Sequence, residues 1–149
     1  MSNMTKEQKE QDSKFKHVYL DANLFIYSIL DDEEIGDKAR KVIENIKSNM
    51  FKGFTSILTL DEIMWAVQKI LGKEKAVEVT NDFISMQNLE FLPVNVQTIK
   101  KAFESYKEGL NPRDAIHCSS MQLKDINIII SSDPDFDRIK GIKRVDFSK

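Results

Sequence analysis

Ile126-Asn127-Ile128-Ile129-Ile130-Ser131-Ser132-Asp133 is the stretch of this chain that decides the fold class. Apolar side chains fall on both faces of its extended part, and a strand buried on both faces belongs in the middle of a parallel sheet covered by helices. The strand then runs into two serines and an aspartate. In open parallel sheets the site lies beyond the carboxyl ends of the strands, so Asp133 is expected at the functional edge.

The rest of the sequence alternates β-rich runs with segments of helical periodicity. Strands are expected at 17–20, 53–55, 89–94, 126–130 and, at an edge, 144–147; helices are expected from 21, at 36–49, from 57 or 60 to 71, at 76–84, at 96–106 and at 111–124. The last helix has the clearest start, because Asn111 is a good N-cap and Pro112 suits the first helical position. This alternation predicts an α/β fold, a three-layer α/β/α sandwich with a central, mainly parallel sheet.

Length and composition indicate one domain. The chain has 149 residues, 41% hydrophobic and 31% charged, which is enough for a single core. Residues 1–16 are charged and lack apolar periodicity, so we expect a flexible tail followed by a single domain over 17–149. The longest uncharged stretches, 22–30 and 126–132, are shorter than the roughly 20 apolar residues of a membrane span. With no apolar signal segment and one cysteine, the expected location is cytoplasmic, without membrane contact.

The net charge of -2 argues against a protein that binds nucleic acid by bulk electrostatics, but it does not exclude a nuclease. A local basic run lies near the C-terminus and comprises Arg138, Lys140, Lys143 and Arg144. A solvated face is the commoner meaning of such a run.

Four carboxylates stand at the edges of the expected strands and helices: Asp21, Glu62, Asp114 and Asp133. Each has a structural explanation when taken alone. Asp21 suits a helix N-cap, and Thr59-x-x-Glu62 matches a capping box. Asp114 is favoured by the partial positive charge at a helix N-terminus. The acids around Pro134, which are Asp133, Asp135 and Asp137, suit a turn.

Their joint placement favours a shared site. Asp21 and Asp133 follow strands directly, and Glu62 and Asp114 begin helices that can open onto the same edge of the sheet. Clustered acids repel each other unless a cation neutralises them, and oxygen ligands suit Mg²⁺ or Mn²⁺ rather than structural Zn²⁺. The sequence therefore predicts a divalent-metal site that activates water for phosphodiester hydrolysis.

Neighbouring residues allow more than one interpretation. Asn23 supplies a neutral amide near the predicted site. His117 is expected to be exposed or hydrogen-bonded rather than a metal ligand, and Cys118 is expected in the core. Trp65 fits the core or a dimer surface better than a base-stacking platform.

The order and spacing of these motifs resemble the PIN-domain nucleases, especially the VapC-type toxins of prokaryotic toxin-antitoxin systems. The similarity covers about residues 17–147. It is carried by Val18-Tyr19-Leu20-Asp21-Ala22-Asn23, Glu62, Arg113-Asp114-Ala115-Ile116-His117 and Ser131-Ser132-Asp133-Pro134-Asp135-Phe136-Asp137.

The resemblance implies a Mg²⁺- or Mn²⁺-dependent endoribonuclease that cleaves RNA. It also implies a homodimer and a small antitoxin whose tail occupies the active-site groove. By the same resemblance the catalytic and metal-binding acids are Asp21, Glu62, Asp114 and, as the fourth, Asp133, ranked ahead of Asp135 and Asp137. The supporting positions match Asn23, Ser131 and Ser132, and Arg113 is a candidate for substrate binding.

Two other functions remain open: a PIN-like RNA-processing nuclease without an antitoxin, and a catalytically inactive PIN-fold binding module. A phosphatase that forms an aspartyl phosphate is disfavoured, because Ala22 and Asn23 follow Asp21 and the second aspartate common in such enzymes is missing.

Overall fold

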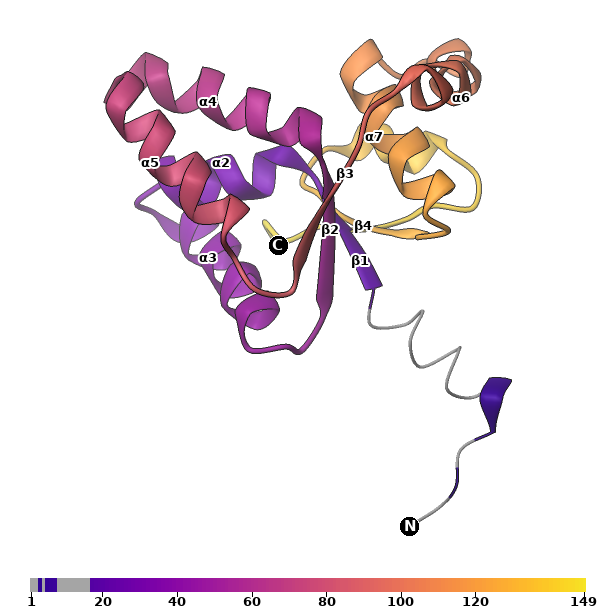
Figure 1. Ribbon diagram of the computed structural model, residues 1–149, viewed down its shortest axis with the longest axis horizontal. Coiled ribbons are helices and arrows are strands. Elements are labelled where there is room, and N and C mark those ends of the chain that lie inside the picture. The colour runs from indigo at the N-terminus through magenta and orange to yellow at the C-terminus, as the bar shows by residue number, and fades with distance from the viewer. Residues whose placement is uncertain (1–2, 4, 8–16) are drawn as a thin grey trace.

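A computed structural model describes residues 3, 5–7 and 17–149. The expected tail, 1–16, lies for the most part outside these residues. The described chain is built on one sheet whose strands are β1 (His17–Leu20), β2 (Lys52–Ser56), β3 (Leu89–Leu92), β4 (Ile128–Ile130) and β5 (Lys143–Val145). All neighbouring strands are parallel, in the order β3-β2-β1-β4-β5 (Figure 1). The parallel sheet expected from the apolar run at 126–130 is confirmed.

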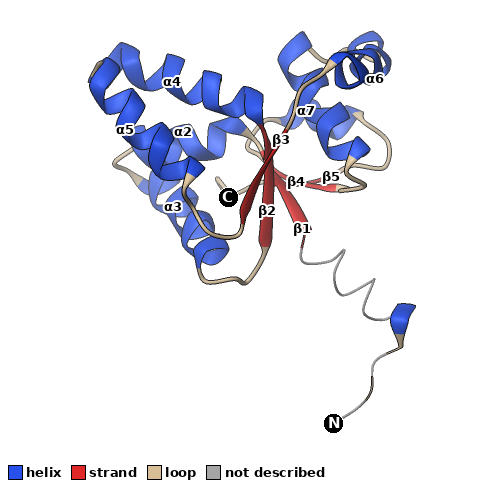
Figure 2. Ribbon diagram, in the orientation of Figure 1, coloured by secondary structure: helices blue, strands red, loops and turns tan. Residues whose placement is uncertain are grey.

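Helices cover both faces of the sheet (Figure 2). One layer consists of α2 (Ala22–Leu30), α3 (Glu34–Lys47), α4 (Ile57–Leu71) and α5 (Lys73–Ile84). The other layer consists of α6 (Val96–Lys107) and α7 (Pro112–Leu123), and a short 3-10 helix, η1 (Pro134–Arg138), follows β4. The three-layer α/β/α sandwich is therefore confirmed.

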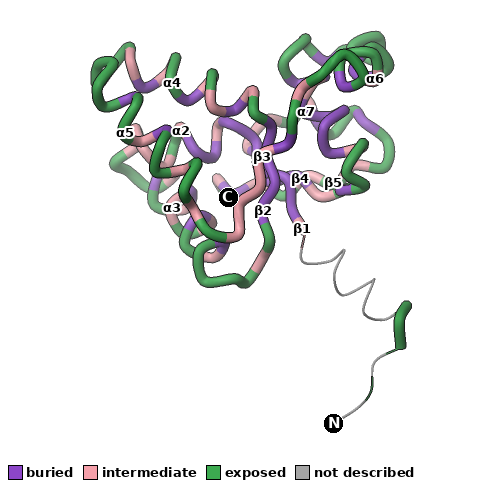
Figure 3. Tube along the Cα trace, viewed as in Figure 1, coloured by how far each residue is buried: buried purple, intermediate pink, exposed green. Residues whose placement is uncertain are grey.

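Two apolar clusters fill the spaces between the layers. The alternation of side chains along β1 sends Val18 and Leu20 into one cluster and Tyr19 into the other. Phe25 of α2 is fully buried in the first cluster, where its ring meets that of Phe83 with centroids 4.9 Å apart. Figure 3 shows buried residues along the strands and on the sides of the helices that face them. Strand β1 is therefore covered on both faces.

Some local expectations were wrong. The helix that follows β2 is capped by Ser56, whose hydroxyl accepts a hydrogen bond from the Leu58 N–H, so the capping box from Thr59 to Glu62 does not form. Trp65 is 53% exposed and is not a core residue.

Other expectations hold. Cys118 is fully buried in the second cluster, as expected of a core residue. The edge strand is present, although it ends at Val145, and Phe147 beyond it is buried against the first cluster. In the described part of the chain no helix combines the length and the apolar character that crossing a membrane requires.

Candidate active site

The site lies where the strand order reverses direction. From β1 the chain proceeds outward through β2 to β3, and then returns to place β4 on the other side of β1. The carboxyl ends of β1 and β4 thus form the kind of crevice in which open α/β sheets bind ligands. Asp21 directly follows β1, and Ser131 to Asp133 follow β4. Glu62 lies in α4, which follows β2, and Asp114 lies in the first turn of α7.

Asp21 is positioned by β4 rather than by its own helix. It occupies the N-cap position of α2, but its side chain makes no capping hydrogen bond. Instead the Ser131 hydroxyl donates to Asp21 Oδ2 at 2.6 Å, and the Asp21 N–H donates to the Ile130 carbonyl at 3.1 Å. Burial raises the pKa of this carboxyl, although nearby His117 and the Ser131 hydroxyl partly offset that effect. Asp21 is therefore the N-cap residue of α2, as its structural interpretation expected, but its side chain does not cap the helix.

Asp114 is held by the residue that starts its helix. Asn111 Oδ1 accepts a hydrogen bond from the Asp114 N–H at 2.9 Å, and Asn111 Nδ2 donates to Asp114 Oδ2 at 2.9 Å. Burial, together with the charges of Asp21, Asp133 and Glu62, raises the pKa of Asp114 to about 7, against the opposing effect of His117. The four acids expected to converge therefore act on one another electrostatically.

Three acids follow β4, and the structure separates their surroundings. Asp133 caps η1, since its Oδ1 accepts from the Asp135 N–H at 2.9 Å, while the Asp133 N–H donates to the Ser131 hydroxyl. Asp137 instead accepts two hydrogen bonds from Arg144, at 2.9 and 3.0 Å. These bonds lower the pKa of Asp137. Arg144 is therefore engaged in structure rather than forming part of a free basic run.

The acids that come together suit a divalent cation. Asp114, Asp133 and Asp135 each offer a carboxylate oxygen, and these oxygens all lie within 4.8 Å of one another. Oxygen ligands grouped in this way fit Mg²⁺ or Mn²⁺. Asp21 and Glu62 are outside this group of three, although their charges act on Asp114.

The side chain of Asn23 lies at the same edge of the sheet, and its oxygen has no partner within the described part of the chain. Its Nδ2 donates to the Ser132 hydroxyl at 2.9 Å and lies 3.5 Å from the Ser131 hydroxyl. Among the atoms that the structure describes, Asn23 Oδ1 is buried and has no hydrogen-bond partner. A buried amide oxygen without a partner is costly, and a cation or its bound water would satisfy it. The residues present thus fit the group that the sequence suggests.

Glu62 of α4 is hydrogen-bonded to His117 of α7, which belongs to the other helical layer. His117 is fully buried, so the exposed alternative is wrong and the hydrogen-bonded one is confirmed. Its Nε2 lies 2.6 Å from Glu62 Oε1, and its Nδ1 lies 2.7 Å from the Tyr19 hydroxyl. Burial lowers the pKa of His117, but the hydrogen bond to Glu62 and the charge of Asp21 raise it more, so the net shift is upward.

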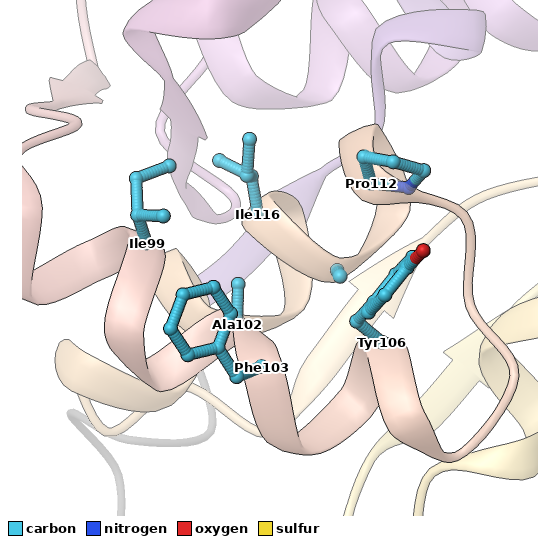
Figure 4. A pocket seen from close by; sticks show the side chains of 7 residues that line it. Ile99, Ala102, Phe103, Tyr106, Pro112 and Ile116 are labelled. Atoms are coloured by element: carbon cyan, nitrogen blue, oxygen red, sulfur yellow. The ribbon is translucent and has the colours of Figure 1, made fainter.

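An apolar pocket lies between α6 and α7 (Figure 4). It is lined by Ile99, Ala102, Phe103, Tyr106, Pro112, Ala115 and Ile116. Because it has no acid, amide or hydroxyl group of the kind found at the edge of the sheet apart from the Tyr106 hydroxyl, it is not where a metal ion would bind. Asp114 lies on the same helix but belongs to the acidic group.

Comparisons with known proteins agree with this architecture. The family model described as PIN domain matches residues 18–142. Ribonuclease VapC2 of Methanocaldococcus jannaschii is 27% identical over 143 residues, which cover 87% of this chain and 89% of that protein.

Solved structures show the same fold. The DNA-bound VapBC from Salmonella typhimurium contains a chain with a TM-score of 0.69 and 23% identity, covering 88% of this chain and 98% of its own. Mycobacterium tuberculosis VapC20, a sarcin-ricin loop cleaving toxin, has a TM-score of 0.68 and 17% identity, covering 80% of this chain and 92% of its own. Since the family match extends over most of the chain and the fold agrees, the chain belongs to the PIN domain family of nucleases.

Proposed function

We propose that this chain is a divalent-metal-dependent endoribonuclease that hydrolyses RNA phosphodiester bonds as the toxin of a type II toxin-antitoxin system. The observation that carries the proposal is the group formed by Asp114, Asp133 and Asp135, with Asp21 and Glu62 acting on it, at the switch point of a PIN fold. The relative named as a ribonuclease supports RNA as the substrate.

Each acid has a proposed role. A bound Mg²⁺ or Mn²⁺ would stabilise charge on the attacked phosphate and make a bound water more acidic. Asp114, Asp133 and Asp135 would hold the ion, with Asp135 joining Asp133 rather than replacing it. Asp21, which accepts a hydrogen bond from Ser131, and Glu62, which is hydrogen-bonded to His117, would complete the negative rim around the ion and its bound water.

Substrate binding is proposed for Arg113. This residue is exposed and immediately precedes Asp114 in the first turn of α7. A guanidinium at the rim of an acidic site suits a phosphate of the RNA backbone, because arginine can donate two parallel hydrogen bonds to it.

Two protein partners belong to the same proposal, a second copy of the chain and a small antitoxin. The described structure exposes apolar side chains on α4 and α6: Met64, Trp65, Ile70, Val96, Phe103 and Tyr106. Apolar surface of this kind marks sites where proteins associate. The Salmonella neighbour is described as a VapBC bound to DNA. Light scattering of the purified protein tests the homodimer, and co-purification with the product of an adjacent small reading frame tests the antitoxin.

Cleavage of single-stranded RNA tests the enzymatic part. Purified protein should cut RNA with Mn²⁺ or Mg²⁺, and EDTA should stop the reaction. Asp21→Asn should reduce the rate on the order of 100-fold or more, since it removes a negative charge from the rim of the site. Asp61→Asn is the matched control, because Asp61 is an exposed neighbour of Glu62 on α4 and should cleave like the wild type.

The outcomes separate the alternatives. Full activity in Asp21→Asn contradicts the proposed site. Absence of both cleavage and Mn²⁺ binding by calorimetry supports an inactive binding module. Metal-dependent cleavage by a chain whose gene has no antitoxin-like neighbour supports an RNA-processing nuclease. Because RNA is the substrate, we also propose a cytoplasmic location, which cell fractionation tests.

A further inference from the structure

A buried hydrogen-bonded chain connects three of the elements that carry the acids. Tyr19 of β1 bonds His117 of α7, and His117 bonds Glu62 of α4, over distances of 2.7 and 2.6 Å. Tyr19 and His117 are both fully buried, and the side chain of Glu62 is 17% exposed. The row of hydrogen bonds therefore runs from the core, at Tyr19, to the partly exposed carboxylate of Glu62.

The roles of donor and acceptor follow from the chemistry of the groups. A carboxylate only accepts hydrogen bonds, so His117 Nε2 carries the hydrogen that it shares with Glu62. In a neutral ring, Nδ1 then accepts from the Tyr19 hydroxyl, and in a charged ring Nδ1 donates to it. Burial raises the pKa of Tyr19 well above its usual value, so the phenol keeps its proton. The bond to Glu62 has the same direction in both states of the ring.

Glu62 needs such support more than the other acids do. Asp21 is held by Ser131, Asp114 by Asn111, and Asp133 by the N–H of Asp135. For Glu62, His117 is the one hydrogen-bond partner found in the described part of the chain. A free glutamate has a longer side chain than aspartate and loses more rotational freedom when it is fixed.

Packing in the core alone does not explain why Tyr19 and His117 are buried next to each other. A fully buried imidazole and phenol each require partners, and apolar side chains would fill the same space without that requirement. Here one ring nitrogen of His117 bonds the Tyr19 hydroxyl and the other bonds Glu62, so both nitrogens of the buried ring are satisfied in the arrangement that ends on Glu62.

We infer that His117, seated on Tyr19, is a positioning residue that fixes the Glu62 carboxylate at the rim of the active site. The inference rests on the proposed nuclease function. It assigns Tyr19 and His117 to the reaction although neither is placed to contact the metal or the RNA. Such supporting partners are typically worth about 10- to 100-fold in activity.

A double-mutant cycle tests the inference in the full-length protein. His117→Ala should lower kcat for RNA cleavage about 10- to 100-fold with little change in KM. His117→Gln should recover part of the rate, because its amide can donate from near the position of Nε2. Tyr19→Phe, which keeps the ring in the core, should lower kcat about fivefold, the equivalent of one lost hydrogen bond.

The decisive comparison is made in a Glu62→Ala background. A residue that acts only through Glu62 has no further effect once that carboxylate is gone, so His117→Ala and Tyr19→Phe should there change the residual kcat by less than about twofold. Equal effects in the two backgrounds would mean that both residues merely support the fold, and would overturn the inference. Thermal unfolding of each variant identifies losses that come from instability.

A proton NMR spectrum separates failure of this inference from failure of the proposed function. The His117 Nε2 proton, buried and bonded to a carboxylate, should give a slowly exchanging downfield signal that Glu62→Ala removes. Wild-type protein that shows this signal but does not cleave RNA refutes the nuclease proposal and still supports the hydrogen bond by which His117 positions Glu62. Active wild-type protein without the signal refutes only the inference that His117 positions Glu62.

Discussion

Replacing Asp114 by asparagine should stabilise the protein when no metal is bound. The wild-type carboxyl is buried among other acids, and these surroundings raise its pKa from 3.8 to about 7. Asparagine has nearly the same shape, carries no charge, and can still accept the hydrogen bond from Asn111 Nδ2. The variant therefore removes a repulsion while keeping the start of α7.

The magnitude follows from the pKa shift of Asp114. One pKa unit corresponds to about 1.4 kcal/mol, so a shift of roughly three units makes ionisation in the folded protein cost roughly 4 kcal/mol more than in the unfolded chain. Solvent and salt at the mouth of the site screen part of this energy, and we expect a gain in unfolding free energy of about 2 kcal/mol. In a domain of this size that gain raises Tm by about 4 to 8 °C.

The pH dependence has a definite sign. The pKa of Asp114 is higher in the folded protein than in the unfolded chain, so the stability linked to its proton is present below pH 3.8 and is lost as the pH rises to about 7. The advantage of Asp114→Asn should consequently be largest near neutral pH and above, and most of it should have disappeared by about pH 4.5.

Thermal unfolding in EDTA near neutral pH and at about pH 4.5 measures the difference in stability between Asp114→Asn and the wild type. Asp82→Asn, at an exposed position on α5, is the control and should show no such pH-dependent gain. Added Mn²⁺ should raise the Tm of the wild type more than that of Asp114→Asn, because the variant lacks one ligand. A metal-free variant no more stable than the wild type above pH 7 would refute the reasoning.

Three further predictions concern other parts of the structure. Asp135→Asn should weaken Mn²⁺ binding about tenfold or more, whereas Asp137→Asn should bind like the wild type because Arg144 holds Asp137; calorimetry measures both, and equal losses would contradict the proposed ligand set. Phe25→Ala should lower the unfolding free energy in urea by about 3 to 5 kcal/mol, since this ring is fully buried, and a loss below about 1 kcal/mol would contradict its place in the core. Asn111→Ala should cost about 1 kcal/mol through loss of the α7 cap and should also slow RNA cleavage; unchanged values of both would show that the cap is dispensable.

The parallel sheet and much of the acidic site were predictable because both depend on local patterns. The apolar run ending at Ile130 required a strand covered on both faces, and the acids Asp21 and Asp133 directly follow their strands in the chain. The start of α7 was equally clear, since Asn111 and Pro112 act within one turn of the helix. None of these inferences needed knowledge of distant contacts.

The remaining features depend on contacts that the local sequence does not encode. Tyr19 and His117 are 98 residues apart in the chain, and their hydrogen bond forms only once α7 packs against the sheet. One signal was available: His117 lies three residues after Asp114, which puts the two on the same face of a helix. The sequence ranked Asp133 ahead of the two acids that follow it, but it could not show that Arg144 engages Asp137 and leaves Asp135 beside Asp133.

The central position of β1 has a consequence for how the protein can be controlled. This strand is paired on both sides, with β2 and β4, and its carboxyl end leads directly into Asp21. The amide hydrogens of Tyr19 and Leu20 should therefore exchange with solvent only when the whole domain opens, whereas the outer strands β3 and β5 can loosen earlier. Loosening of β5 would leave Asp21 in place, but it would release η1, because Arg144 of β5 holds Asp137 there.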